Sequence, residues 1–282
     1  PDFNARTFNK EQIYKKLYPG KTFSDGVMRN ILSKTLELAE NFLAIKQFRD
    51  DEFTYSLYLL QAIGKKGNDK LFNKAEERSA LLLSNSKVKD EIYFLNSYRL
   101  NNEKRLFSKN QKSSLYFSDE LIKNSTESIS LSFLILMLRN YTDIANTNMK
   151  MFKFEESESL SEFEKYADIE VKRHNSTEYL QYYYFAFKLA KSHDEKYFFE
   201  LKKIAETSYS KFSERDRRDI FTILTNYCYF KVNTGDLNFR KEHFFLLKEN
   251  FERGNYKGTR NYVDHISYFN VIVTGLDAGE IK

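Results

Sequence analysis

Apolar residues recur every three or four positions along most of this 282-residue chain, which is the spacing of one face of an α-helix. The clearest stripe runs through the segment 24–48 and consists of Met28, Ile31, Thr35, Leu38, Phe42 and Ile45. Alternating apolar and polar runs, which are typical of strands, are missing from the sequence. The pattern therefore predicts an all-α protein.

Capping signals mark where these helices begin. A small polar residue followed three positions later by an acid or amide recurs at 9–12, 159–162, 175–178, 192–195 and 213–216. Together with the apolar stripes, these signals predict helices over 9–18, 24–48, 50–64, 69–83, 88–106, 115–123, 126–151 and 260–274, and helices starting near 159, 175, 192, 213 and 236. Gly235 and Gly254 are expected to end two of them, and the polar stretch 107–114 is expected to be a loop.

The predicted helix starts in the second half lie roughly 16–23 residues apart, so pairs of helices span roughly 33–46 residues, the length of helix–turn–helix repeats. This predicts a right-handed α-α superhelix, a TPR-like solenoid of antiparallel helix pairs. We expect one continuous array over residues 1–282, with a sub-boundary near 107–114 or 152–158. The strict tetratricopeptide consensus is not met, since the chain has no Trp.

Composition narrows the class further. Two Pro and nine Gly are too few for the many turns of a sandwich or barrel, and 26 Phe and 20 Tyr supply more apolar area than disordered chains carry. The single cysteine excludes an internal disulfide, and the most apolar run, 131–138, is shorter than the ~20 residues that span a bilayer. These features favour a cytoplasmic protein that does not enter the membrane.

Three segments carry a resemblance to a known family. They are FNKEQIYKKLYPGKTFSDGVMRNILSKTLELAENFLA (8–44), LSFLILMLRNYTDIANTNMKMF (131–152) and RDIFTILTNYCYFKVNTGD (218–236). In this order the segments resemble a family of uncharacterised bacterial proteins with TPR-like helical repeats, usually about twice as long as this chain. The resemblance implies the fold and an internal fragment of a longer protein, but no activity or catalytic residue.

The sequence contains no recognisable catalytic apparatus. Phosphate-binding loops, nucleophile elbows and the H-E-x-x-H motif are missing, and none of the four histidines has a His or Cys partner at metal-ligand spacing. Cys228 lies in an apolar segment, which predicts a buried structural thiol. We therefore expect no enzyme activity, catalytic residue, cofactor or metal, and no small-molecule ligand.

The most unusual local feature is a run of aromatic residues between positions 179 and 187, which covers the whole circumference of a helix. Core packing is one interpretation, and a partner-binding surface is the other. The second interpretation gives a candidate surface made of Tyr179, Tyr182, Tyr183, Phe187, Arg215 and Arg218. The predicted function is a non-catalytic scaffold that binds a protein or peptide, and the alternative is a nucleic-acid-binding regulatory protein that uses this Tyr/Arg surface. Acidic residues interleaved with the basic ones weaken that alternative.

Overall fold

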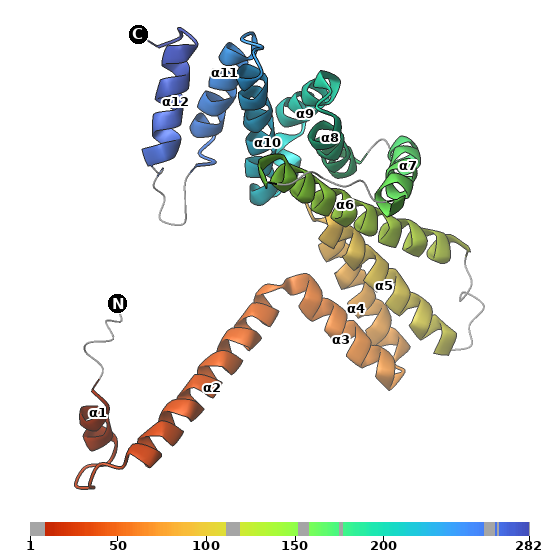
Figure 1. The fold of residues 1–282 in the computed structure, drawn as a ribbon. Coiled ribbons are helices and arrows are strands. Elements are labelled where there is room, and N and C mark those ends of the chain that lie inside the picture. The colour runs from red at the N-terminus through yellow and green to blue at the C-terminus, as the bar shows by residue number, and fades with distance from the viewer. Residues whose placement is uncertain are drawn as a thin grey trace. The chain divides into compact units, whose positions relative to one another are not determined.

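A computed structural model describes residues 9–110, 119–151, 158–174, 177–256, 263 and 265–281 of the chain. Within these residues the protein forms twelve α-helices and no β-strand, which confirms the all-α prediction (Figure 1). The chain divides into two compact units between Leu82 and Leu83, in the last turn of one helix. Neither expected sub-boundary, 107–114 or 152–158, coincides with this division.

The first unit contains four helices, α1 (Lys10–Leu17), α2 (Asp25–Asp50), α3 (Glu52–Lys66) and most of α4 (Asp69–Ser84). Side chains cap all four N-termini: Asn9 accepts a hydrogen bond from the Gln12 amide, and Ser24, Asp51 and Asn68 do the same for α2, α3 and α4. The predicted end of α3 at Gly64 is one turn too early, because Gly67 supplies the left-handed conformation (φ 64°) that ends this helix.

Helix α2 has the predicted periodicity but keeps much of its apolar stripe in contact with solvent. Met28 is buried, whereas Leu38, Phe42 and Ile45 are 70%, 65% and 54% exposed. Sequence spacing thus identified the helix correctly and did not reveal which part of the stripe is covered.

The second unit contains eight helices. They are α5 (Glu91–Asn110), α6 (Asp119–Met151), α7 (Glu158–Arg173), α8 (Glu178–Ser192), α9 (Glu195–Thr207), α10 (Glu214–Asn233), α11 (Phe239–Glu252) and α12 (His265–Asp277). A short 3-10 turn, Tyr209–Lys211, joins α9 to α10. Gly235 and Gly254 have φ of +99° and +75° just after α10 and α11, which confirms their predicted role as helix ends.

Two boundaries in the second unit also differ from the prediction. Helix α5 continues through residues 107–110, so the expected loop 107–114 is wrong over its first half, and its remainder lies outside the described residues. One helix, α6, replaces the two expected at 115–123 and 126–151, because Thr126 donates its hydroxyl to the Ile122 carbonyl inside the helix and does not cap a new one.

Packing in the second unit is mainly between helices that follow one another. Helices α5 and α6 pack together, and so do α8 with α9, α9 with α10, α10 with α11, and α11 with α12. Helix α6 also packs directly on α8, while α7 lies to one side and makes fewer contacts with α8 (Figure 1). One stretch of α6, Asp119–Ile144, is long and apolar enough to cross a membrane by length and composition, and 33% of its most apolar window is buried.

Candidate functional site

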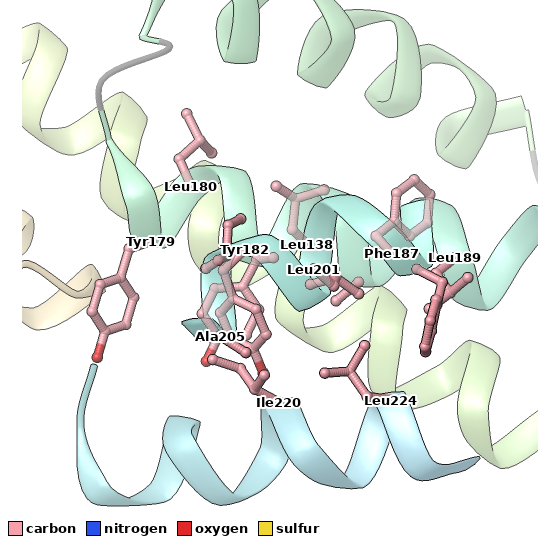
Figure 2. Close-up of a cluster of buried hydrophobic side chains, with 14 of the residues drawn as sticks. Leu138, Tyr179, Leu180, Tyr182, Phe187, Leu189, Leu201, Ala205, Ile220 and Leu224 are labelled. Carbon is pink, nitrogen blue, oxygen red and sulfur yellow. The ribbon is translucent and has the colours of Figure 1, made fainter. Parts of the chain in front are cut away.

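The aromatic residues of α8 form part of the core of the second unit. Figure 2 shows Tyr179, Tyr182 and Phe187 in one buried cluster with Leu138 of α6 and Leu224 of α10. The exposed fractions of the four predicted aromatic site residues are 2% for Tyr179, 1% for Tyr182, 4% for Tyr183 and 1% for Phe187. The interpretation of these residues as an accessible surface is therefore wrong, because a helix that is apolar around its circumference is covered by neighbours on several sides.

The two arginines of the predicted surface, Arg215 and Arg218, lie on α10, where Arg215 is exposed and Arg218 is partly exposed. Each pairs with an acid one helical turn away: Arg215 Nε lies 3.7 Å from Asp219 Oδ2, and Arg218 pairs with Glu214. These pairs reduce the field that the arginines offer to a phosphate chain. The aromatic residues with which they were grouped are buried, whereas both guanidinium groups keep part of their surface in contact with solvent.

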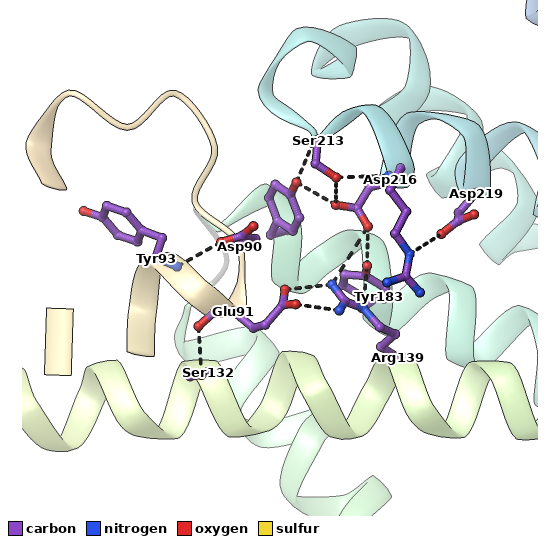
Figure 3. Close-up of polar contacts among 11 residues, drawn as sticks. Asp90, Glu91, Tyr93, Ser132, Arg139, Tyr183, Ser213, Asp216 and Asp219 are labelled. Carbon is purple, nitrogen blue, oxygen red and sulfur yellow. Dashed lines mark hydrogen bonds and ion pairs between the residues drawn. The ribbon is translucent and has the colours of Figure 1, made fainter. Parts of the chain in front are cut away.

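A buried polar network lies beneath α10 and connects four helices (Figure 3). We call it the Asp216 network, and it consists of Glu91, Arg139, Tyr179, Tyr183, Ser213 and Asp216. The Asp216 carboxylate accepts hydrogen bonds from the Tyr179 hydroxyl (2.8 Å), the Tyr183 hydroxyl (2.5 Å) and the Ser213 hydroxyl (2.5 Å). Ser213 is also the N-cap of α10, since its hydroxyl accepts from the Asp216 amide at 3.1 Å.

Arg139 connects this carboxylate to α5. Its guanidinium donates to both Glu91 oxygens at 2.5 and 2.7 Å, donates to the Tyr183 hydroxyl at 2.9 Å, and lies 3.9 Å from Asp216. Burial disfavours the charged guanidinium, but the hydrogen bonds and charge of Glu91, together with Tyr183, outweigh this and raise the pKa of Arg139. Burial and the adjacent Asp216 carboxylate raise the pKa of Tyr183 well above its ordinary value.

These electrostatics favour a structural role for the Asp216 network. A phenol whose pKa is raised stays protonated at neutral pH and cannot serve as a general base. The carboxylates of Glu91 and Asp216 are held by hydrogen-bond donors, as a stable buried network requires. The network therefore fixes the positions of α5, α6, α8 and α10.

A small cavity of about 190 Å³ opens beside the network. Its lining includes Arg139, Asp143, Arg215 and Asp219 and the edges of Tyr182 and Tyr183, so Arg215 does meet two of the predicted aromatics here. Burial, which is opposed by Arg215, raises the pKa of Asp219. The volume of this cavity lies below the ~300–1,000 Å³ of typical ligand pockets. Its two arginines, Arg139 and Arg215, share the lining with the acids Asp143 and Asp219.

Cys228 has the predicted environment. It is buried, and burial raises the pKa of its thiol, which is the opposite of what activates a nucleophile. Within the described part of the chain, no group of three or more His, Cys, Asp or Glu side chains is arranged to hold a metal ion.

Helices α10, α11 and α12 form a trough of about 520 Å³, which we call the α10–α12 trough. Because α11 packs on both α10 and α12, it forms the floor, and the other two helices form the walls. The α10 wall presents Thr222, Asn226, Tyr229 and Asn233, the floor presents Arg240, His243, Leu247 and Asn250, and the α12 wall presents Phe269, Asn270, Val273, Thr274 and Asp277.

Each helix contributes a stripe of residues at helical spacing to the α10–α12 trough. The α10 stripe is exposed, and Tyr229 is 60% exposed, whereas Leu247 and Asn250 of the floor are buried. Sequence reasoning missed this site because it searched for charged and aromatic clusters. The available signal was a polar stripe at steps of four, three and four on α10, opposite that helix's apolar face.

No protein-family model, characterised protein or solved structure matches the chain. The case for a function therefore depends on the geometry of the α10–α12 trough.

Proposed function

We propose that this chain is a non-catalytic helical scaffold that binds a protein or peptide partner in the α10–α12 trough. The observation that carries the proposal is that three successive helices each direct one stripe of side chains into a single open trough. Its volume of about 520 Å³ lies within the usual range of ligand sites. The serial packing of α8 to α12 supports a TPR-like, right-handed solenoid, in which a concave groove is the usual binding surface.

Several observations support binding without catalysis. Most of the polar groups that line the trough are amides and hydroxyls, which recognise ligands but do not form an acid–base pair by themselves. In the Asp216 network, the Asp216 carboxylate is already hydrogen-bonded to the hydroxyls of Tyr179, Tyr183 and Ser213. We place the protein in the cytoplasm as part of this proposal, since its single cysteine is a buried free thiol.

Nucleic-acid binding is the weaker candidate. The basic residues near α10 are paired with acids, as Lys202 is with Glu242 at 2.8 Å and as Lys211 is with Glu178. The trough itself contains one arginine, Arg240, and one acid, Asp277. A phosphate chain would find little uncompensated positive charge there.

The proposal is tested by screening a random array of immobilised heptapeptides with the purified chain. A filled-trough variant, Asn226→Trp, is compared with Lys248→Trp, which places the same ring on an exposed part of α11 outside the trough. We expect bound peptides to be lost with Asn226→Trp and retained with Lys248→Trp. Equal binding by both variants, or retention of RNA that falls steeply with salt in place of peptide binding, would contradict the proposal.

A further inference from the structure

We infer that the α10–α12 trough binds an extended, uncharged polypeptide segment of about five residues, whose main chain is hydrogen-bonded by the amides of Asn226, Asn233 and Asn270. This inference rests on the proposed function, and it specifies the conformation and chemistry of the partner. Three properties of the trough support it: length, amide placement and charge.

The length of the trough matches a short extended chain. Its α10 wall runs from Thr222 to Asn233, eleven positions further along, which at about 1.5 Å per residue is about 16 Å. An extended chain rises about 3.3 Å per residue, so about five residues cover this length.

The amides of the trough argue against a helical partner. The backbone N–H and C=O groups of a helix already bond to one another, whereas a single extended strand leaves these groups available to the trough.

Three amides are free to bond to such a strand. Asn226, Asn233 and Asn270 are exposed, and none of them makes a hydrogen bond to another residue in the part of the chain that the structure describes. The floor amide of Asn250 differs, since its oxygen accepts from Asn255 Nδ2 at 2.8 Å. An asparagine side chain offers one acceptor and two donors, which complement the N–H and C=O of a peptide group.

The amide spacing also fits an extended chain. Asn226 and Asn233 are two helical turns apart on the same face, about 10.5 Å at 1.5 Å per residue. Three residues of extended chain cover about 10 Å. The two amides can therefore bond to peptide groups three residues apart.

The charge and apolar surface of the trough define the side chains of the partner. Arg240 and Asp277 line the trough with opposite charges, so a strongly acidic or basic segment gains no net attraction. Phe269 and Val273 on one wall and Leu247 on the floor provide an apolar surface. We therefore expect a neutral segment that carries one aliphatic or aromatic side chain.

The test measures fluorescence anisotropy with acetyl- and amide-capped heptapeptides. One set has Leu or Phe at the centre and Ser, Thr, Gln and Ala as neighbours, and matched sets replace the neighbours by Asp and Glu or by Lys and Arg. The tightest neutral peptide is then remade with N-methylated amides, one position at a time. Binding is compared between the natural chain, the double variant Asn226→Leu/Asn233→Leu, and the control Asn73→Leu, which removes an exposed helical amide of α4.

We expect neutral peptides to bind at least tenfold more tightly than charged ones. N-methylation should weaken binding about tenfold at each of two positions. The double variant should also weaken binding about tenfold, and Asn73→Leu should leave it unchanged. All variants are exposed substitutions, and unchanged far-UV circular dichroism confirms their folding. Binding that is lost with Asn226→Trp yet indifferent to N-methylation or to peptide charge would overturn this inference and leave the proposed function standing. Failure of every peptide to bind in the trough would overturn both.

Discussion

The hydroxyl of Tyr183 donates to the buried carboxylate of Asp216 and at the same time accepts from the guanidinium of Arg139. One side chain of α8 thus forms hydrogen bonds both to an anion on α10 and to a cation on α6. The aromatic run of the sequence therefore has a polar function inside the core, in addition to the apolar area that it buries.

Tyr183→Phe should destabilise the protein by about 1–3 kcal/mol, because the buried carboxylate and guanidinium each lose a hydrogen-bond partner. The measurement is the midpoint of urea unfolding followed by circular dichroism. Tyr166→Phe is the matched control, since Tyr166 is a partly exposed residue of α7, and it should shift the midpoint little. Equal shifts for the two variants would show that the hydroxyl of Tyr183 is not energetically important.

Arg139→Met should cost more, about 3–5 kcal/mol, because it leaves the carboxylates of Glu91 and Asp216 buried without their cation. Adding Glu91→Leu to this variant should recover part of the lost stability, since one of the two buried carboxylates left without a cation is then removed. The free energies of unfolding of the single and double variants give the comparison. A double variant that is less stable than Arg139→Met would contradict the account.

Gly275→Ala should weaken the packing of α12 against its neighbours. A Cβ at this position would lie 2.4 Å from Ile281 Cδ1 and 2.8 Å from Phe244 Cε2, distances at which the neighbours must move. We expect a loss of about 1–3 kcal/mol and faster amide hydrogen exchange in α12. Gly26→Ala is the control, because its Cβ would meet nothing within 4 Å, and it should stabilise α2 by about 0.5–1 kcal/mol.

His243 should make the protein less stable in mild acid. Burial lowers the pKa of His243 below its ordinary value, and the same trough contains Tyr229, Arg240 and Asp277. Below pH ~6.5 the unfolded chain binds a proton that the folded chain resists, so stability falls as pH falls from about 6.5 to the folded-state pKa. Unfolding midpoints at several pH values for the natural chain and for His243→Gln check this, and the variant should lose that part of the pH dependence. Parallel curves for the two proteins would argue against it.

Local chemistry explains which features the sequence predicted well. Asn9, Ser24 and Ser213 cap helices as expected, because each side chain bonds to an amide only three residues away. The segment 192–195 also precedes a helix as expected, but Asp194 is its N-cap and His193 takes the left-handed conformation that ends the preceding helix. When several residues that can cap a helix lie within a few positions of one another, their sequence patterns are similar, and the pattern does not show which of them is the cap.

Features that depend on distant contacts were not predicted. Glu91 and Arg139 are 48 positions apart, and nothing in either neighbourhood identifies the other as its partner. The α10–α12 trough likewise exists only because three separate stripes face one another once the helices pack. For the aromatic run on α8, sequence showed an apolar circumference but not the neighbours that cover it.

The direct packing of α6 on α8, past α7, also has a consequence for folding kinetics. Most helix contacts in the second unit join consecutive helices, which gives a low contact order and favours rapid folding. The bonds of Arg139 to Tyr183 and to Glu91 instead close loops of 44 and 48 residues, whose entropy must be lost before the contacts form. The assembly of α5 and α8 around Arg139 of α6 should therefore be the slowest step in forming this unit, and under mechanical pulling it should be the point at which helix-by-helix unfolding from the C-terminal side pauses.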